Sequence, residues 1–528
     1  MVDTSVKSEE SSQAMRRRLV SRLEAALPGT PVRAMIVGAA TIALASAWFN
    51  EGFFSYDEHF QILEFAWFKL GRTPAAGLAW EFGARMRPAL QPWLAAGLFK
   101  GLEAIGLFTP LAAAFVLRLA SGLIGLWVSL ELCVRTLPSV QDARLKRLLL
   151  AGMLFLWFLP YAHGRFASEN WGGLLFFGGL CLITDAVDPA VRRPLLRAAL
   201  GGLLWSAAFF CRFQVGLAIA GAGVWLLAVA RARVGVVGAL AASFVAACAV
   251  NVVLDRWLYS EWVCTPCNYF YVNVMLGKAA AFGVMPWWFY LAQLLALLVP
   301  PFSLLLVALL AASVWSCRRH VLVWAVVPFV VGHTVLGHKE TRFLISMTYA
   351  LVPLIVLGAD RLPAEWLDRL RVWQRQRAGV ISMRVFLGLN LLALAVMTVK
   401  PSHETAVVYR RLYEASLAGP VVLFSRTRLP YALGEMEVDF YRPDNLMLKP
   451  LRSAGEVSAS MAATPGRVFF FEDSLRVPGW MADGRIACTP VARTLPVWAP
   501  RYNVNNWTGR LSRWSVFALS PAAGTGGC

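Results

Sequence analysis

The chain has 528 residues, of which 58% are hydrophobic and only 15% are charged, and its mean hydropathy is +0.58. Charged residues make up roughly 25% of an ordinary soluble domain. This composition therefore excludes an ordinary soluble protein and predicts that a lipid bilayer surrounds most of the chain. The excess of 50 Lys and Arg over 31 Asp and Glu does not indicate nucleic acid binding, because many basic residues lie in short loops between apolar runs.

The chain begins with a basic segment, residues 1–33, which we expect in the cytoplasm. The apolar stretch that follows it ends in small residues that resemble a signal-peptidase site. We expect it to stay as an uncleaved first span, because cleavage would remove a helix that the predicted topology needs.

Apolar runs recur through the next part of the chain. A helix crosses the hydrocarbon core in roughly 20 apolar residues, and this length predicts about eleven spans, several of them short. The runs are 34–50, 109–132, 147–160, 171–187, 196–210, 213–230, 234–254, 286–313, 321–337, 343–358 and 380–399. We therefore predict an all-α polytopic membrane domain over residues 34–399.

The loops between these runs differ in charge. With the N-terminus in the cytoplasm, every second loop faces inward, and these loops are the arginine-rich ones, as the positive-inside rule requires. They carry Arg135, Arg144, Lys146 and Arg147; Arg192, Arg193 and Arg197; Arg231 and Arg233; Arg318 and Arg319; and Arg361, Arg369, Arg371, Arg375 and Arg377. The polar motifs consequently fall on the non-cytoplasmic side.

The first outward segment, residues 51–108, is too long for a simple connection. Its stretches 60–70 and 90–102 have the pattern of amphipathic helices that lie along a membrane surface. Trp side chains are natural anchors at the headgroup level. The segment offers Trp67, Trp80 and Trp93 for this purpose.

The sequence pattern changes after Lys400, where long apolar runs give way to shorter segments. Short β-prone runs at 421–424, 468–471 and 514–519 are separated by Gly, Pro and polar turns, and a helix is expected at 454–463. These features predict a small extracytoplasmic α/β domain over residues 400–528.

A carboxylate-rich motif follows the first span. Asp57 and Glu58 are adjacent, and on a regular helix Asp57, Gln61 and Glu64 share one face, with Glu58 offset; Trp80 and Glu81 follow. A carboxylate beside a hydrophobic wall has its pKa raised toward values that suit a general base. The alternative is a solvated helix start, in which the acidic residues stabilise the first turn.

A cation-rich motif lies between two later spans. His338, Lys339 and Arg342 stand within five residues on the outward side, where they could hold an anionic headgroup. Ordinary loop charge is the alternative, although charges that set orientation belong on the cytoplasmic side. Arg165 and Arg212 are further outward arginines at span ends, and taken alone each suits a snorkelling anchor.

The remaining reactive residues favour structural roles. Cys264 and Cys267 could form a local disulfide, a redox pair or half of a metal site, and the structural role is favoured because no second pair follows. His333 lies inside an apolar run and is expected to be a hydrogen-bonded core histidine. The sequence has no phosphate-binding Gly loop, no Gly-x-Ser-x-Gly elbow and no His-Glu-x-x-His motif.

Several of these motifs occur in the order typical of one enzyme family. They are Asp57-Glu58-x-x-Gln61-x-x-Glu64, Trp80-Glu81 with Arg87, Arg165-x-x-Ser168, Pro266 to Tyr290, and His338-Lys339-Glu340-x-Arg342-Phe343. The chain resembles glycosyltransferase family 22, the mannosyltransferases of GPI-anchor and dolichol-linked oligosaccharide synthesis, and a bacterial member is expected. It departs from the family pattern at Ser55-Tyr56, where the family usually has His-Pro, and this departure bears on the acceptor and the sugar.

The resemblance implies a GT-C fold and transfer of a sugar, most often mannose, from a polyprenyl- or dolichyl-phosphate donor to a glycan or glycolipid acceptor, with inversion. Asp57 is then the expected base, assisted by Glu58. The donor phosphate is expected at His338, Lys339 and Arg342, with Arg165 and Arg212 as weaker candidates. Substrate-binding candidates are Gln61, Glu64, Trp80, Glu81 and Arg87. No metal or other cofactor is expected, because a lipid phosphate is already a good leaving group, although Asp57, Glu58 and His338 could bind a metal if they converge.

Two alternatives stay open at the level of sequence. A membrane transporter or lipid-linked-sugar flippase would also carry charged residues within spans, and another GT-C enzyme would transfer a different sugar, such as arabinose or an aminosugar. The Ala-, Arg- and Trp-rich composition favours a bacterial inner membrane over the endoplasmic reticulum. In either case the site is expected on the periplasmic or luminal side.

Overall fold

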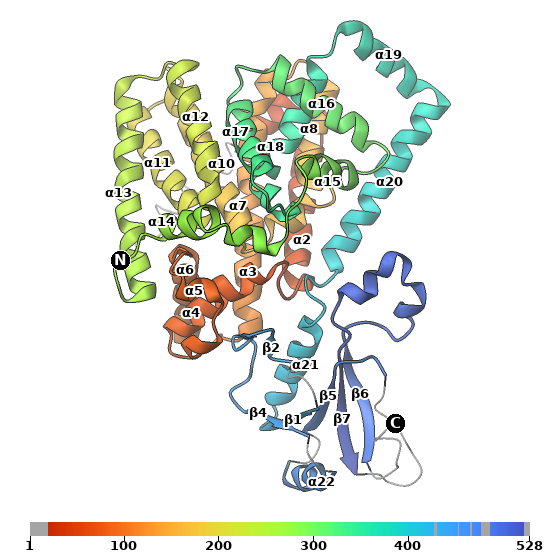
Figure 1. Ribbon diagram of the computed structural model, residues 1–528. Helices are drawn as coiled ribbons and strands as arrows, with labels where there is room; N and C mark the ends of the chain where they lie inside the picture. Colours follow the sequence, from red (N-terminus) through yellow and green to blue (C-terminus); the bar gives the residue numbers. More distant parts are fainter. Residues whose placement is uncertain (1–18, 427–429, 452–453, 465–466, 477–485, 522–528) are drawn as a thin grey trace. The chain divides into compact units, whose positions relative to one another are not determined.

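A computed structural model describes residues 19–426, 430–451, 454–464, 467–476 and 486–521 (Figure 1). The chain forms two compact units that do not follow chain order. The first, here called the helical unit, comprises the described residues up to Phe49 together with Ala84–Trp93 and Val116–Lys400. The second, the mixed unit, comprises Asn50–Gly83, Leu94–Phe115 and the described residues from Pro401 onward.

The helical unit is built almost entirely of α-helices. Among them α10 packs on α11 and α11 on α13, while α12 packs on α17 and α16 on α18. The helices are α2 (Val32–Phe49), most of α7 (Pro110–Thr136), α8 (Ala143–Phe155), α9 (Leu159–His163), α10 (Ser168–Val187), α11 (Pro194–Cys211), α12 (Gly216–Ala228), α13 (Val234–Tyr259), α14 (Thr265–Phe270), α15 (Phe289–Leu297), α16 (Ser303–Ser316), α17 (Val321–Val335), α18 (Thr348–Asp360), α19 (Ala364–Arg375) and α20 (Arg377–Val399).

Seven helices in the described part of the chain are long and apolar enough to cross a membrane. They are Val32–Phe49, Pro110–Ser139, Ser168–Val187, Pro194–Cys211, Val234–Tyr259, Thr341–Asp360 and Arg377–Val399. A further candidate is the pair α16 and α17, which is bent by 115° at its break. The protein is therefore a multi-pass membrane protein, as its composition predicts.

Other predicted spans coincide with shorter or broken helices. The run 286–313 is not one helix, because α15 ends before Pro300 and Pro301, and proline cannot continue the backbone hydrogen bonding of a helix. The run 147–160 contains most of α8 and the start of α9. The run 213–230 contains a helical segment of 16 residues, Phe213–Ala228, which is shorter than a typical span.

Small residues set how closely these helices approach. A Cβ atom added at Gly221 on α12 would collide with the backbone oxygen of Trp324 on α17. One added at Gly358 on α18 would collide with the backbone oxygen of Leu309 on α16. Helices in membranes associate through such close backbone contacts, because lipid gives no hydrophobic drive between them.

The mixed unit joins the first outward segment to the C-terminal residues. Its helical elements are a run from Tyr56 to Lys69 (α3, Tyr56–Glu58; a π-helical turn, His59–Leu63; α4, Glu64–Lys69), α5 (Trp80–Gly83), most of α6 (Leu90–Ala104), α21 (Ala406–Ser416) and α22 (Ala454–Ala463). Helices are thus found at both predicted amphipathic stretches.

The C-terminal part of the mixed unit holds a five-stranded sheet with the strand order β4-β1-β5-β7-β6, whose strands β5, β7 and β6 lie side by side in Figure 1. Strand β1 pairs in parallel with both β4 and β5, whereas β7 is antiparallel to β5 and β6. The strands are β1 (Val421–Ser425), β4 (Leu446–Pro450), β5 (Val468–Glu472), β6 (Ile486–Arg493) and β7 (Ser515–Pro521), with a separate hairpin of β2 (Ala432–Leu433) and β3 (Met436–Glu437). The predicted C-terminal strands and helix are confirmed.

One predicted membrane anchor is a core residue instead. The side chain of Trp67 is only 5% exposed, and its ring packs against Phe99, Phe108 and Phe440. The aromatic ring is buried against the C-terminal residues, which the local pattern of 60–70 does not reveal. Trp80 and Trp93 are exposed.

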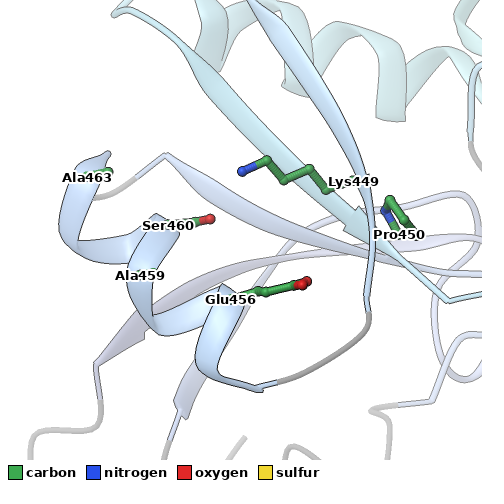
Figure 2. A pocket seen from close by; sticks show the side chains of 6 residues that line it. All are labelled: Lys449, Pro450, Glu456, Ala459, Ser460 and Ala463. Carbon is green, nitrogen blue, oxygen red and sulfur yellow. The ribbon is translucent and has the colours of Figure 1, made fainter.

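A hollow of about 480 Å³ lies between α22 and the end of β4. Figure 2 shows Lys449, Glu456 and Ser460 around this space. Its described lining residues are Lys449, Pro450, Glu456, Ala459, Ser460 and Ala463, and they include no residue of the predicted site. The candidate site therefore has to be built from other parts of the chain.

Candidate functional site

The carboxylate motif lies at the start of the helical run Tyr56–Lys69. Ser55 takes the extended N-cap conformation, and Asp57 and Glu58 occupy the first turn, where negative charge interacts favourably with the helix dipole. Asp57 is partly exposed, whereas Glu58 is buried at 6% exposure. An oxygen of Glu58 accepts the backbone N–H of Phe54 at 2.9 Å, so Glu58 also fixes the turn that precedes the helix.

The shared helix face predicted for these residues is modified by the π-helical turn His59–Leu63. A π turn holds more residues than an α turn, so the spacing between Asp57 and Glu64 is not that of a regular α-helix. Gln61 donates to Glu81 on α5 at 2.9 Å, while Glu64 has a different set of partners. Trp80, next to Glu81, is exposed.

Glu64 is a buried carboxylate of the mixed unit with partners at two distant points of the chain. Its side chain is 1% exposed, and one oxygen lies 2.8 Å from Nε2 of His59, which is fully buried. The same oxygen accepts the backbone N–H of Phe440 at 3.0 Å. Burial raises the pKa of Glu64, while His59 and the N–H of Phe440 partly offset that rise. This geometry favours a structural role for Glu64 over direct contact with a substrate.

Further contacts bind the segment before the motif to residues after the last span. Glu51 pairs with Arg410, and its backbone oxygen accepts the N–H of Ser402 at 2.8 Å. The ring of Phe53 stacks on His403 at 4.2 Å and on His59 at 5.0 Å. The C-terminal residues thus help to hold the start of the carboxylate motif.

The cation motif lies in the helical unit: His338 and Lys339 are in the loop after α17, and Arg342 is in the 3-10 turn Thr341–Met347 that follows. His338 Nε2 lies 3.0 Å from Glu340 Oε1, and its Nδ1 lies 2.9 Å from the backbone oxygen of Gly283. Lys339 is 4% exposed and donates to the backbone oxygens of Leu336 and Met285 at 2.5 and 3.0 Å. His338 and Lys339 are therefore held in place by defined acceptors.

Two of the predicted arginines meet at a carboxylate that sequence reasoning did not single out. Glu169 is 1% exposed, and its Oε1 lies 3.1 Å from both Arg212 and Arg342. Arg342 also binds Glu340 at 2.6 Å. A cluster of charges from three separate segments is thus assembled around Glu169, and we call Glu169, Arg212, Glu340 and Arg342 the arginine cluster.

Adjacent glycines on α10 explain how this cluster can form. A Cβ atom at Gly172 would lie 2.8 Å from the Cβ of Arg212, and one at Gly173 would collide with the backbone oxygen of Ser346. Ser346 in turn donates to the backbone oxygen of Glu169 at 2.8 Å. Gly172 and Gly173, which follow Glu169 closely in the sequence, are the signal that could have indicated a close approach of other segments to Glu169.

Arg212 has unused hydrogen-bonding capacity. Its side chain is 4% exposed, and its guanidinium carbon lies 4.7 Å from the ring centre of Phe343. Nε and Nη2 of Arg212 have no hydrogen-bond partner among the described residues. Buried donors in this state are costly unless a ligand or water satisfies them, so Arg212 marks a place where an acceptor group would fit.

Two further predicted residues lie in the helical unit. Arg165 is 2% exposed, its backbone oxygen accepts from Asn170 at 2.9 Å, and its guanidinium lies 5.8 Å from the ring centre of Tyr161. This burial contradicts a purely snorkelling role. The guanidinium of Arg87 lies 5.6 Å from the ring centre of Tyr269. Both residues are ordered parts of this unit.

The cysteine pair forms a disulfide. Cys264 and Cys267 are bonded to each other at the start of α14, which fits the favoured structural role. The carboxylate motif and the arginine cluster belong to different units, and their predicted meeting at one sugar phosphate stays a prediction.

Comparison with known proteins identifies the family. The family model of the Alg9-like mannosyltransferases matches residues 35–419. GPI mannosyltransferase 3 of Yarrowia lipolytica is 24% identical over 413 residues, which cover 70% of this chain and 73% of that protein. Mannosyltransferase APTG1 of Arabidopsis thaliana is 24% identical over 327 residues, or 60% of this chain and 57% of that protein.

A solved structure shows the same fold. ArnT from Cupriavidus metallidurans bound to undecaprenyl phosphate matches with a TM-score of 0.54 and 16% identity, over 93% of this chain and 98% of ArnT. At this identity the likeness concerns the fold alone, and it confirms the expected GT-C architecture. Since the family model extends from the first span into the C-terminal part, the chain belongs to the Alg9-like mannosyltransferase family.

Proposed function

We propose that this glycosyltransferase moves mannose, with inversion, from a polyprenyl- or dolichyl-phosphate donor to a hydroxyl of a glycan or glycolipid acceptor. The family assignment supports mannose as the sugar, and the GT-C relative ArnT is bound to undecaprenyl phosphate. Membership of an enzyme family also removes the transporter alternative. We place the reaction on the non-cytoplasmic side of the membrane, in a bacterial inner membrane.

The observation that carries the donor assignment is the buried guanidinium of Arg212, in which two nitrogen atoms, Nε and Nη2, have no hydrogen-bond partner among the described residues. Arginine offers planar, paired donors that match the oxygens of a phosphate. Arg342 meets the same carboxylate, Glu169, at the same distance. A phosphate that binds to Arg212 would therefore also come within the field of Arg342.

The charge balance around the cluster supports an anionic ligand. The cluster itself has two arginines and two carboxylates, and Lys339 is a further cation close to it in sequence, whose ammonium group donates to the backbone oxygens of Met285 and Leu336. His338 lies beside Glu340, and Arg165 is a weaker candidate for the same role. Preorganised cations of this kind stabilise the negative charge that develops on a departing lipid phosphate.

The acceptor side of the reaction is assigned to the carboxylate motif. Asp57 is the proposed base, because it is partly exposed and can reach an acceptor hydroxyl. Glu58 is buried and supports the turn, which suits an orienting role. Gln61, Trp80, Glu81 and Arg87 are proposed to contact substrate, while Glu64 is assigned to holding the motif.

The direct test supplies purified, reconstituted protein with mannose-, glucose- and arabinose-linked polyprenyl-phosphate donors and a mixture of glycolipid acceptors. We expect mannose transfer, detected as a mass increase of one hexose on an acceptor, with the opposite anomeric configuration to the donor. Transfer of arabinose alone would place the chain with GT-C enzymes of another sugar. No consumption of any lipid-linked sugar would contradict the proposed donor class.

The donor site itself is tested by Arg342→Ala. We expect the donor KM to rise by about 10- to 100-fold, since a charged hydrogen bond contributes roughly 1.5 to 3 kcal/mol, while the acceptor KM changes little. Arg375→Ala is the matched control, because Arg375 is an exposed arginine outside the cluster. An unchanged donor KM in Arg342→Ala would show that the phosphate binds elsewhere.

A further inference from the structure

His333 is a buried histidine with one nitrogen unused. It lies on α17, is 2% exposed, and its Nδ1 is 2.8 Å from the backbone oxygen of Phe329. A carbonyl oxygen only accepts hydrogen bonds, so Nδ1 carries the proton and Nε2 is the acceptor in the neutral ring. Nε2 has no hydrogen-bond partner among the described residues.

The ring of His333 borders the arginine cluster. Its centre lies 6.0 Å from that of Phe343 and 6.5 Å from that of Tyr290. Phe343 is also the ring on which the guanidinium of Arg212 lies, at 4.7 Å. The unused nitrogen of His333 and the unused N–H groups of Arg212 therefore belong to residues packed around one phenylalanine.

The two sets of unused groups are complementary in kind. Arg212 offers donors and requires a ligand that accepts, whereas Nε2 of His333 accepts and requires a ligand that donates. A phosphodiester group has no P–OH at neutral pH, so by itself it satisfies only the first of these. A sugar phosphate satisfies both, because its phosphate oxygens accept and its ring hydroxyls donate.

We propose that Nε2 of His333 accepts a hydrogen bond from one hydroxyl of the donor sugar, and that His333 thereby helps to select the sugar. This inference rests on the proposed binding of the donor phosphate at Arg212. A site built to bind a hydroxyl discriminates against analogues that lack it, because its own polar group is then left buried without a partner. The cluster reaches the surface at Glu340, whose side chain is 36% exposed.

The test uses polyprenyl-phosphate mannose and a set of analogues that each lack one ring hydroxyl. With the natural enzyme, kcat/KM should fall for the analogue that lacks the hydroxyl bound by His333, by about 5- to 100-fold. In His333→Phe, kcat/KM for mannose should fall by a similar factor, and the same analogue should then be used about as well as mannose. Sensitivity to the other missing hydroxyls should persist.

Three further variants keep the test decisive. His333→Gln retains an acceptor oxygen and should recover part of the discrimination. His333→Leu, which has no acceptor, replaces His333→Phe if that variant does not fold. Thr334→Val is the matched control, because Thr334 lies on the same helix and bonds only to its own helix backbone, at Val330; its discrimination should match that of the natural enzyme.

The inference is overturned if His333→Phe, or His333→Leu in its place, keeps the full pattern of hydroxyl discrimination. That result would mean that Nε2 is satisfied by a trapped water or is simply part of the core. A failure of the proposed function looks different, since the natural enzyme would then use no polyprenyl-phosphate mannose at all.

Discussion

Asp57→Asn is expected to lower kcat for mannose transfer by about 100- to 10,000-fold, the usual contribution of a general base. Asparagine keeps the size of the side chain but cannot take the proton of the acceptor hydroxyl. Because Asp57 is partly exposed in the first turn of its helix, the variant should fold normally. The donor KM should stay within a few-fold of its natural value, since the donor phosphate is assigned to other residues.

Single-turnover transfer from radiolabelled donor, measured across pH, checks this expectation. Glu58→Gln is the informative neighbour, because Glu58 is buried and bonds to the N–H of Phe54; we expect a smaller loss of kcat and a lower unfolding temperature. Glu435→Gln, a change at an exposed carboxylate of the mixed unit, is the control. Full activity in Asp57→Asn would refute the assignment of the base.

Local patterns predicted much of the fold. The strands at 421–424, 468–471 and 514–519 and the helix at 454–463 were readable because each is a short apolar or regular run bounded by turn residues, and all are present. The spans around α2, α7, α10, α11, α13 and α20 were readable from length and apolarity alone. Breaks within apolar runs were harder to predict. The run 286–313 is apolar throughout and long enough for one span, and its composition alone does not show that the helix is interrupted at the two prolines after α15.

Contacts between distant parts of the chain were not readable. Trp67 has the pattern of an interface anchor, yet it packs against Phe440, and no local signal links residues so far apart. Glu169 looks like a loop carboxylate, and its role as the partner of Arg212 and Arg342 depends on three segments meeting. Residue types therefore indicated the cations but not the carboxylate that organises them.

Other long-range contacts link the C-terminal residues to the segment that carries the proposed base, Asp57. Phe440 bonds to Glu64, Asp439 accepts from Thr73 at 2.5 Å, and Tyr441 stacks on His59 at 5.4 Å. The contacts of Glu64 and His59 hold the helical run Tyr56–Lys69, which carries Asp57, and the contact of Thr73 holds the segment just after it. The residues after the last span thus stabilise the helical run Tyr56–Lys69, which carries the proposed base.

The second large effect is expected from Glu64→Ala. This change leaves His59 and the N–H of Phe440 buried without their partner, and each unsatisfied buried group costs about 1 to 3 kcal/mol. We expect the unfolding temperature in detergent to fall by several degrees and kcat to fall with it, because the helical run that carries Asp57 loses its anchor. The donor KM of the folded fraction should be nearly unchanged.

Glu64→Gln separates the hydrogen bond from the charge. Glutamine can still accept the N–H of Phe440 but does not ionise. Because burial raises the pKa of Glu64 in the folded protein, the natural carboxyl stabilises the fold most below the ordinary carboxyl pKa, and that stability is lost as the pH rises through the raised pKa. The unfolding temperature of Glu64→Gln relative to the natural protein should therefore increase with pH. A relative unfolding temperature that falls as the pH rises would mean that Glu64 is stabilised as a charged group by His59, and Glu64→Ala with natural stability would show that the anchor is dispensable.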